Sequence, residues 1–299
     1  MNLIHPSRFW REAIAIRGSV LPMVLPYVVI FGVIATILRE ISRYLESEHQ
    51  IKISLEVTLY EIIGAALGFI LVLRTNAGYD RWYEGRKLWG GIVNQCRNLG
   101  MNCLAYAGKD PNWQRDFMKL VTLFPFTVRN LLRGQLIPEE AEKILGQEDL
   151  LSLKQFPHPP SFVLMKLAKL LMKAKENGVI DDFAFLNLDQ ERARLMDHLG
   201  ACERILKTPL PLIYSIEIRR SIALFLFILP LALLHRLEND WQTAFLTMMV
   251  AYVLFTLEII GIQLQNPFAA EHLSALPLDD ICKNIERQLT GAMPSENKT

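Results

Sequence analysis

One uninterrupted apolar stretch constrains the fold of this chain more than any other feature. Residues 19–38 read SVLPMVLPYVVIFGVIATIL and contain no charged side chain. A helix of about 20 apolar residues crosses the hydrocarbon core of a bilayer, so this segment is long enough to span a membrane. Pro22 and Pro26 fall in its first two turns, where a missing backbone N–H costs least. We therefore expect a membrane-spanning helix here rather than a buried helix of a soluble core.

Three further apolar segments predict two transmembrane hairpins. Residues 55–73 are purely apolar from Ile62 and return across a polar segment. Residues 221–234 and 243–257 are each short for a span, but a brief polar turn joins them and apolar neighbours extend them. The four expected spans divide the chain into an N-terminal segment with the first hairpin (1–73), a middle region (74–215), the second hairpin (216–263) and a C-terminal segment (264–299).

Basic residues gather on one side of these spans. They precede the first and third spans and follow the second and fourth, and they are Arg8, Arg11, Arg17, Arg74, Arg81, Arg86, Lys87, Arg219, Arg220, Lys283 and Arg287. Positive charge is retained on the cytoplasmic side of a membrane protein. We therefore expect both termini and the middle region in the cytoplasm.

The middle region has helical periodicity and no alternating strand pattern. Helix-like stretches cover residues 113–132, 138–145, 161–175 and 181–207. Ser161 is expected to cap the third stretch, and Gly178 is expected to stop it. The predicted fold class is therefore all-α, an integral membrane protein with a helical cytoplasmic domain.

Composition and charge exclude several classes of function. Hydrophobic residues make up 51% of the 299 residues and charged residues 21%, which indicates a chain partly in lipid and partly in water. The net charge of +1 argues against a nucleic-acid-binding protein. The cysteines form no CxxC pair and the histidines lack zinc-ligand spacing, so we expect buried, reduced thiols and no metal site. No P-loop, GxGxxG, GxSxG or HExxH motif is present, so we expect neither an enzyme nor a cofactor.

The second expected span has two distinct surfaces. One surface is a stripe with a residue at every fourth position, Glu61, Ala65, Phe69 and Leu73. This stripe is apolar apart from Glu61. Gly64 and Gly68 form a GxxxG pattern on a neighbouring face, which allows close helix contact. The stripe either lines a narrow apolar constriction between copies of this helix or faces lipid. The pattern alone leaves both alternatives open.

Two acids lie at the depth of expected spans. Glu61 lies toward the outer end of the second span, and Glu258 lies toward the inner end of the fourth. Charges at such depth are costly and usually face protein or water. Arg74 follows the second span at the inner leaflet, so one expectation is a buried Arg74–Glu258 ion pair. The alternative is a Glu258 that extends to the membrane interface.

Several long motifs resemble those of one family. The segment LRTNAGYDRWYEGRKLWG, residues 73–90, closely resembles the signature of bestrophins, including their bacterial and plant relatives. The N-terminal HPSRFWREAIAIRGSVLP also resembles the family, as do ACERILKTPLPLIYS (201–215), LQNPF (264–268) and LPLDDICKNIE (276–286). The resemblance covers nearly the whole chain, with the motifs in order.

This resemblance implies a funnel-like homopentamer in a bacterial-type inner (plasma) membrane. Its expected partners are copies of itself, the lipid bilayer and small inorganic ions, which it conducts passively. Chloride or another anion is the family default. Cation selectivity is the alternative if Glu61 lies at the outer pore mouth, and a membrane scaffold without transport is a further one. The implied pore neck is formed by Ala65, Phe69 and Leu73, and the implied cytoplasmic exit constriction lies at Phe183, with Ile180 as the alternative.

Two features of the sequence depart from the family pattern. Animal bestrophins carry a calcium-binding acidic run after their Asn-Pro-Phe motif, where this chain has Ala269, Ala270, Glu271 and His272. Calcium takes six to eight oxygen ligands, so we expect no calcium clasp. Ala65 is also smaller than the bulky residue usual at that level of the neck.

Overall fold

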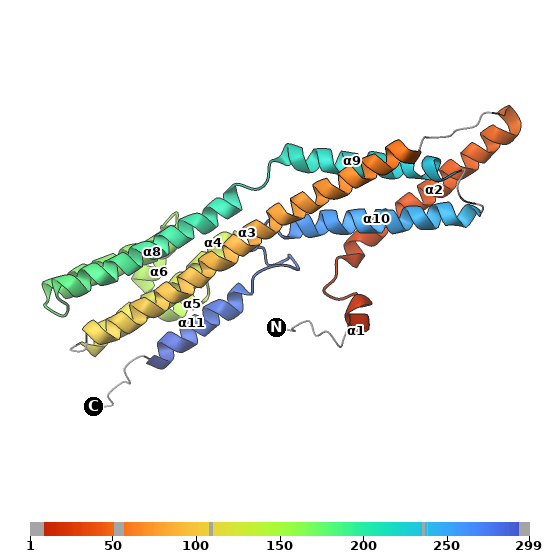
Figure 1. Cartoon of the computed structure of the whole chain (residues 1–299). Coiled ribbons are helices and arrows are strands. Elements are labelled where there is room, and N and C mark those ends of the chain that lie inside the picture. The colour runs from red at the N-terminus through yellow and green to blue at the C-terminus, as the bar shows by residue number, and fades with distance from the viewer. Residues whose placement is uncertain (1–8, 51–56, 108–109, 235–236, 238, 293–299) are drawn as a thin grey trace. The chain divides into compact units, whose positions relative to one another are not determined.

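The chain is helical wherever the structure describes it. The computed structural model describes residues 9–50, 57–107, 110–234, 237 and 239–292, and these contain no strand. The helices, labelled in Figure 1, are α1 (Phe9–Ala13), α2 (Leu21–His49), α3 (Val57–Tyr106), α4 (Pro111–Leu132), α5 (Glu140–Ile144), α6 (Gln147–Gln155), α7 (Pro159–Glu176), α8 (Asp182–Lys207), α9 (Leu212–Leu233), α10 (Asp240–Gln263) and α11 (Leu278–Ala292). The predicted all-α class is confirmed.

The chain divides into two compact units. The first unit comprises Met1–Arg81, Pro209–Gln265 and His272–Ser274, and the second comprises Trp82–Thr208, Asn266–Glu271 and Ala275–Thr299. The boundary between Arg81 and Trp82 falls inside α3, which is one continuous helix. The sequence predicted a membrane span that ends at residue 73, and α3 continues beyond that residue to Tyr106.

Helices long and apolar enough to cross a membrane are found where the first, second and fourth spans were predicted. They are α2, the Tyr60–Tyr106 part of α3, and the Trp241–Gln263 part of α10. α9 falls outside the same criterion, because Glu217, Arg219 and Arg220 occupy its first half and leave too short an apolar run. The third span therefore stays a prediction.

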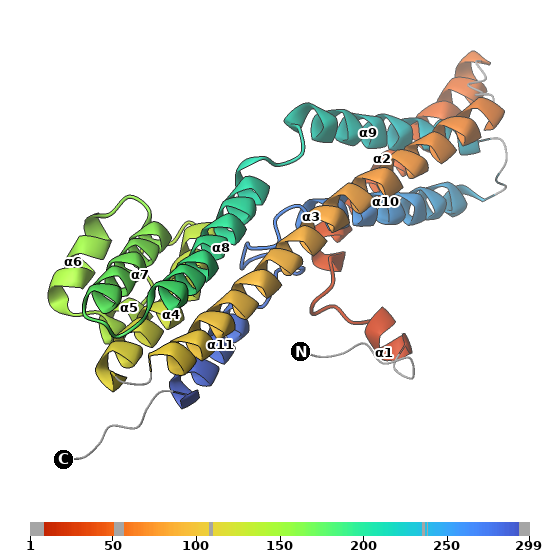
Figure 2. The ribbon, with the colours of Figure 1, turned by 60° about the vertical axis from the view of Figure 1, so that its left-hand side comes forward.

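The first unit is held together by an apolar core. Figures 1 and 2 both show α2 lying alongside α10. Gly32 permits this close approach, since a Cβ there would lie 2.7 Å from the Met248 Cγ. The buried residues come from four helices: Val24, Val28 and Phe31 of α2, Leu67 and Leu71 of α3, Ile218, Ile222 and Leu226 of α9, and Ala251 and Leu254 of α10.

The second unit is built around α4, most of which is buried. α4 packs against α7, α8 and α11, with α5 and α6 beside it (Figure 2). Asp110 caps α4 by accepting hydrogen bonds from the backbone N–H groups of Asn112 and Trp113, at 3.1 and 3.0 Å. The four helical stretches predicted for the middle region correspond to α4, α5, α7 and α8. α6 and α11 were not predicted.

The ends of α7 include one correction. The helix begins at Pro159, and its N-cap is His158, so the predicted cap at Ser161 is wrong. Two prolines at the first positions supply no N–H groups that need a cap, and the Ser161 Oγ instead lies 2.6 Å from the His158 Nδ1. Gly178 follows the helix with φ +70°, and the predicted stop there is confirmed.

The cysteines are free and buried, as expected. Burial raises the pKa of Cys96, and it raises the pKa values of Cys103, Cys202 and Cys282 to about 12. These thiols remain protonated at neutral pH, and they behave as small apolar side chains of the second unit.

Candidate functional site

The predicted stripe on α3 is exposed along its whole length. Glu61, Ala65, Phe69 and Leu73 all lie on the surface of the first unit, with Phe69 64% exposed. The opposite face of the same helix is buried, with Leu67 and Leu71 in the core of this unit. Phe69 is a large aromatic side chain that points outward from a helix. An exposed side chain of this kind commonly marks contact with lipid, with another protein surface or with a pore. The stripe is therefore exposed to lipid, to another protein surface or to a pore.

The exposed face of α3 that carries the stripe is apolar up to Leu73 and polar beyond it. Asn76 and Asp80 lie on the exposed side one and two turns further along α3. The apolar part of the stripe is therefore short, and it runs from Ala65 to Leu73. Asn76 was not among the predicted site residues, although its three-residue spacing from Leu73 was readable in the sequence.

The two glycines of α3 have different surroundings. A Cβ at Gly64 would lie 2.9 Å from Cζ of Phe225 on α9, whereas a Cβ at Gly68 would have no atom within 4 Å. Tyr60 fixes the same contact, because its ring stacks on Phe225 at 4.4 Å and its hydroxyl donates a 2.5 Å hydrogen bond to the Phe225 carbonyl oxygen. The surface of Gly64 is thus taken by α9 of the same chain. The close helix contact that the glycine pattern allows is therefore made at Gly64 with α9, whereas Gly68 has open space at its Cβ position.

The structure brings together Arg74 and Glu258 in a buried ion pair. Arg74 is 1% exposed and Glu258 is 3% exposed, and the Arg74 Nη1 donates to Glu258 Oε2. The burial of Glu258 excludes the alternative in which its carboxylate extends to the membrane interface. The pair joins α3 to α10, directly after the last residue of the stripe.

Two further residues of α9 complete this charged cluster. The Arg219 Nε donates to the second carboxylate oxygen of Glu258 at 2.9 Å, and the Arg74 Nη2 donates to Ser215 Oγ at 3.2 Å. Arg219 remains largely solvent-accessible, with 61% of its side chain exposed. With two arginines and one glutamate, the cluster carries one net positive charge. The sequence analysis used Arg219 only for orientation and did not predict this contact.

In the second unit, the turn between α7 and α8 distinguishes the two candidates for an exit constriction. The backbone N–H groups of Val179 and Ile180 both bond to the Ala174 carbonyl oxygen, at 2.8 and 3.4 Å. This closure turns Ile180 into the core, where it is 4% exposed, and Asp181 then caps α8. Phe183 follows in the first turn of α8 and is 84% exposed. Of the two side chains, Phe183 is exposed and Ile180 is buried, which favours Phe183 as the candidate lining residue.

Comparison with known proteins identifies the family. The family described as "Bacterial/Fungal Bestrophin protein" matches residues 1–291 of this chain. The chain belongs to the bacterial and fungal bestrophin family.

Curated relatives and solved structures agree with this assignment. A voltage-dependent anion channel-forming protein of Nostoc sp. is 32% identical over 96% of this chain and 92% of its own length. One of Synechocystis sp. is 31% identical over 95% of this chain and 93% of its own. The crystal structure of a bacterial bestrophin homolog from Klebsiella pneumoniae superimposes with a TM-score of 0.82 at 23% identity, covering 90% of this chain and 98% of that one. The curated relatives are named as channel-forming proteins, which indicates a channel and not an enzyme, and the apolar helices identify this bestrophin as a membrane protein.

Hydrogen bonds between side chains and the backbone hold the Asn-Pro-Phe motif of this bestrophin and the segment after it. Phe268 is fully buried, and its N–H bonds to the Asn266 Oδ1 at 3.1 Å. Within the first unit, the Gln263 carbonyl oxygen accepts from Ser274 Oγ at 2.7 Å and lies 3.2 Å from His272 Nδ1. Among the residues that the structure describes, no group of three or more His, Cys, Asp or Glu side chains is placed to hold a metal ion.

Proposed function

We propose that this bestrophin is a homopentameric anion channel whose neck is formed by Ala65, Phe69 and Leu73 from each subunit. The observation that carries the proposal is the outward face of α3, which is apolar and exposed while the opposite face is buried in the core. Five such faces around an axis would enclose a narrow apolar passage, and such a passage gates ions by dewetting. The names of the curated relatives support an anion as the permeant ion.

The charged cluster also supports anion selectivity. It holds a net charge of +1 in each subunit, and Arg74 directly follows the last neck residue, Leu73. Arg74 and Glu258 offset each other, so the net charge of the cluster lies on Arg219, whose side chain is 61% exposed. Its field is therefore partly screened by salt, and it acts mainly within about one Debye length. Five copies would carry five positive charges around the inner end of the neck. Such a ring attracts chloride and repels sodium.

Glu61 favours a second candidate function, a cation-selective channel of the same architecture. Its side chain is exposed and lies on the same stripe as the neck residues. A ring of five carboxylates at the outer mouth would concentrate cations. The ring of Glu61 side chains would be negative, and the ring of charged clusters would be positive. The narrow, poorly hydrated part of the neck near Phe69 and Leu73 would lie closer to the positive ring. We therefore favour the anion channel.

A reversal-potential measurement distinguishes these functions. Purified protein in a planar bilayer under a KCl gradient should reverse near the chloride equilibrium potential, and reversal near the potassium potential would refute anion selectivity. Glu61→Gln should shift a cation-selective channel toward anions. Glu40→Gln is the matched control, since Glu40 lies on α2 and pairs with Arg43 of the same helix. A membrane scaffold would give no current under any of these conditions.

The proposal includes the arrangement of the channel in the membrane. Spans over residues 19–38, 55–73, 221–234 and 243–257 would place both termini in the cytoplasm of a cell with a bacterial-type inner membrane. The middle region 74–215 and the C-terminal segment 264–299 would form the cytoplasmic part, with Phe183 at its exit constriction. Native mass spectrometry of the detergent-solubilised protein tests the pentamer, and a dominant mass other than five subunits would refute it.

A further inference from the structure

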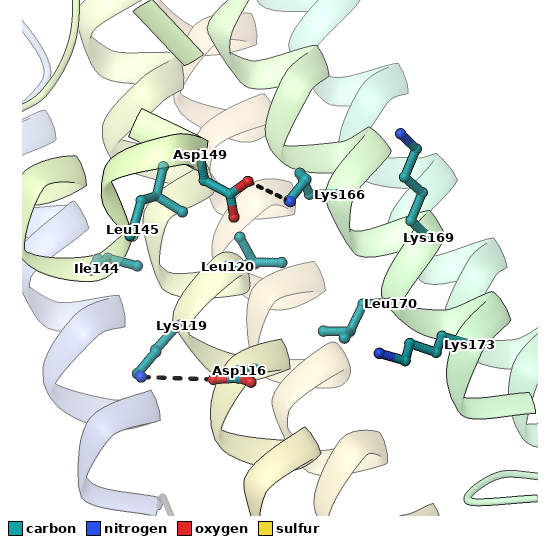
Figure 3. A pocket seen from close by; sticks show the side chains of 11 residues that line it. Asp116, Lys119, Leu120, Ile144, Leu145, Asp149, Lys166, Lys169, Leu170 and Lys173 are labelled. Carbon is teal, nitrogen blue, oxygen red and sulfur yellow. Dashed lines mark hydrogen bonds and ion pairs between the residues drawn. The ribbon is translucent and has the colours of Figure 1, made fainter. Parts of the chain in front are cut away.

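A basic cleft on the second unit is independent of the proposed pore. It is a cavity of about 430 Å³ between α4, the α5–α6 turn, α6 and α7. Figure 3 shows its lining, which is Asp116, Lys119, Leu120, Ile144, Leu145, Gly146, Asp149, Lys166, Lys169, Leu170 and Lys173. Small-molecule sites commonly enclose about 300–1,000 Å³, so this cleft has the size for an organic ligand and is larger than a lone inorganic ion needs.

The cleft carries an uncompensated positive charge. Its four lysines and two aspartates give +4 − 2 = +2. Both aspartates are already paired, Asp116 with Lys119 at 3.7 Å and Asp149 with Lys166 at 2.6 Å. Lys169 and Lys173 form no ion pair with any residue that the structure describes. These two ammonium groups are therefore available to a ligand with about two negative charges.

Three of the four lysines come from one face of α7. Lys166, Lys169 and Lys173 follow each other at intervals of three and four residues, which places them side by side along the helix. Trp113 fastens this helix to α4, since its indole Nε1 donates a 3.1 Å hydrogen bond to the Leu170 carbonyl oxygen. The wall that carries the free ammonium groups is thus fixed in place, which lowers the entropy cost of binding.

The floor of the cleft is apolar. Leu120 lies between the two ion pairs in Figure 3, Leu170 lies beside Lys173, and Ile144 and Leu145 close the side formed by the α5–α6 turn. A free phosphate or sulfate would satisfy the ammonium groups and leave this floor uncovered. A ligand with an anionic head and a small apolar body would satisfy both.

We propose that this cleft binds a small organic dianion with an apolar body, such as a phosphate monoester or a dicarboxylate. Either head group carries close to two negative charges at neutral pH. Its charge would be held by Lys169 and Lys173, and its body would lie on Leu120 and Leu170. This site does not depend on the channel function, because binding is measured without any ion flux.

Isothermal titration calorimetry on the purified full-length protein in detergent, at about 50 mM salt, tests the proposal. The probes are phenyl phosphate and phthalate, which distinguish the two head groups, and inorganic phosphate, which has charge without an apolar body. We expect saturable binding of at least one aromatic dianion, about tenfold or more tighter than inorganic phosphate. Equal binding of inorganic phosphate, or no saturable binding of either aromatic dianion, would overturn the assignment.

Charge variants then locate the site. The double variant Lys169→Gln/Lys173→Gln should weaken binding about tenfold or more, because it removes two charge-assisted contacts. Asp149→Asn should tighten it, since that change releases Lys166 and raises the net charge of the cleft. The matched control is Lys143→Gln/Lys154→Gln, which removes the same charge outside the lining. If both double variants lose affinity equally, general electrostatics rather than this cleft holds the ligand, and the proposal fails.

Discussion

Removal of Glu258 should destabilise the protein more than removal of either of its arginine partners. Glu258→Leu leaves Arg74, which is 1% exposed, without its carboxylate in the interior of the first unit. Arg74→Met leaves Glu258 with a remaining partner, because the Arg219 Nε still donates to it at 2.9 Å. The loss should therefore be larger for Glu258→Leu than for Arg74→Met.

The magnitude follows from the burial of the pair. An uncompensated buried charge costs about 3–5 kcal/mol, whereas replacing both partners of a buried pair by apolar side chains is close to neutral. For a chain of this size, each kcal/mol lowers the Tm by about 2 °C or more, so Glu258→Leu should lower it by about 6 °C or more. The double variant Arg74→Met/Glu258→Leu should recover most of that loss. Arg219 is 61% exposed in its side chain, so it can turn to solvent at little cost.

The assay is thermal unfolding of the detergent-solubilised protein, followed by tryptophan fluorescence and by the retained oligomer peak after heating. Glu217→Gln is the matched control, because it breaks the exposed Arg220–Glu217 pair of the neighbouring turn. That surface pair contributes less than about 1 kcal/mol, so its loss should shift the Tm by about 2 °C at most. A Tm for Glu258→Leu equal to that of the control, or a double variant less stable than Glu258→Leu, would refute the reasoning.

The other predictions concern the neck, the α3–α9 contact, calcium and the thiols. Phe69→Ala should widen and wet the proposed neck, so single-channel conductance or open probability should rise at least about twofold; a wild-type value would remove Phe69 from the neck and shift attention to Phe183. Gly64→Leu should force a side chain against Phe225 and lower the Tm by about 2 °C or more, whereas Gly68→Leu, with open space at its Cβ, should leave the Tm near wild type. Micromolar calcium should leave open probability unchanged in bilayer recordings, and a reproducible rise would demand a site beyond the described residues. The four buried thiols should react with a maleimide reagent slowly in the native protein at pH 7.5 and completely after denaturation in SDS, because burial raises each pKa; rapid native labelling would contradict this.

The membrane helices were predictable because hydrophobic length is a local property of the sequence. Residues 19–38 and 62–73 can be recognised without knowledge of their neighbours. The extension of α3 was also readable and was missed. Its buried positions in the second unit recur at three- and four-residue intervals, at Trp89, Ile92, Cys96, Leu99 and Cys103. This part is more polar than the span, so hydropathy marks only the apolar segment, whereas the 3.6-residue helical period continues beyond it.

The sequence predicted only some of the contacts in the charged cluster. The depth of Glu258 and the position of Arg74 after a span indicated a pair, because each charge alone would be costly there. The choice of Arg219 and Ser215 as further partners depends on how α9 rotates against α3 and α10, which the sequence of α9 does not encode locally. The same limit applies to Gly64. Whether its small surface meets another copy or Phe225 is decided by tertiary packing.

Phe183 and Ile180 show how a single turn decides which side chain can serve a site. They are three residues apart and both apolar, so periodicity alone cannot assign one to the core and one to the surface. The decision comes from Gly178, whose φ of +70° lets the chain reverse so that the next two N–H groups reach the Ala174 carbonyl oxygen. Ile180 then points inward, and Asp181 starts a new helix on the next residue. Phe183 consequently lies on the first turn of α8, where its side chain is 84% exposed. Exposure of a large aromatic side chain to water costs free energy that burial would avoid. That cost supports the proposal that Phe183, rather than Ile180, lines a cytoplasmic exit constriction.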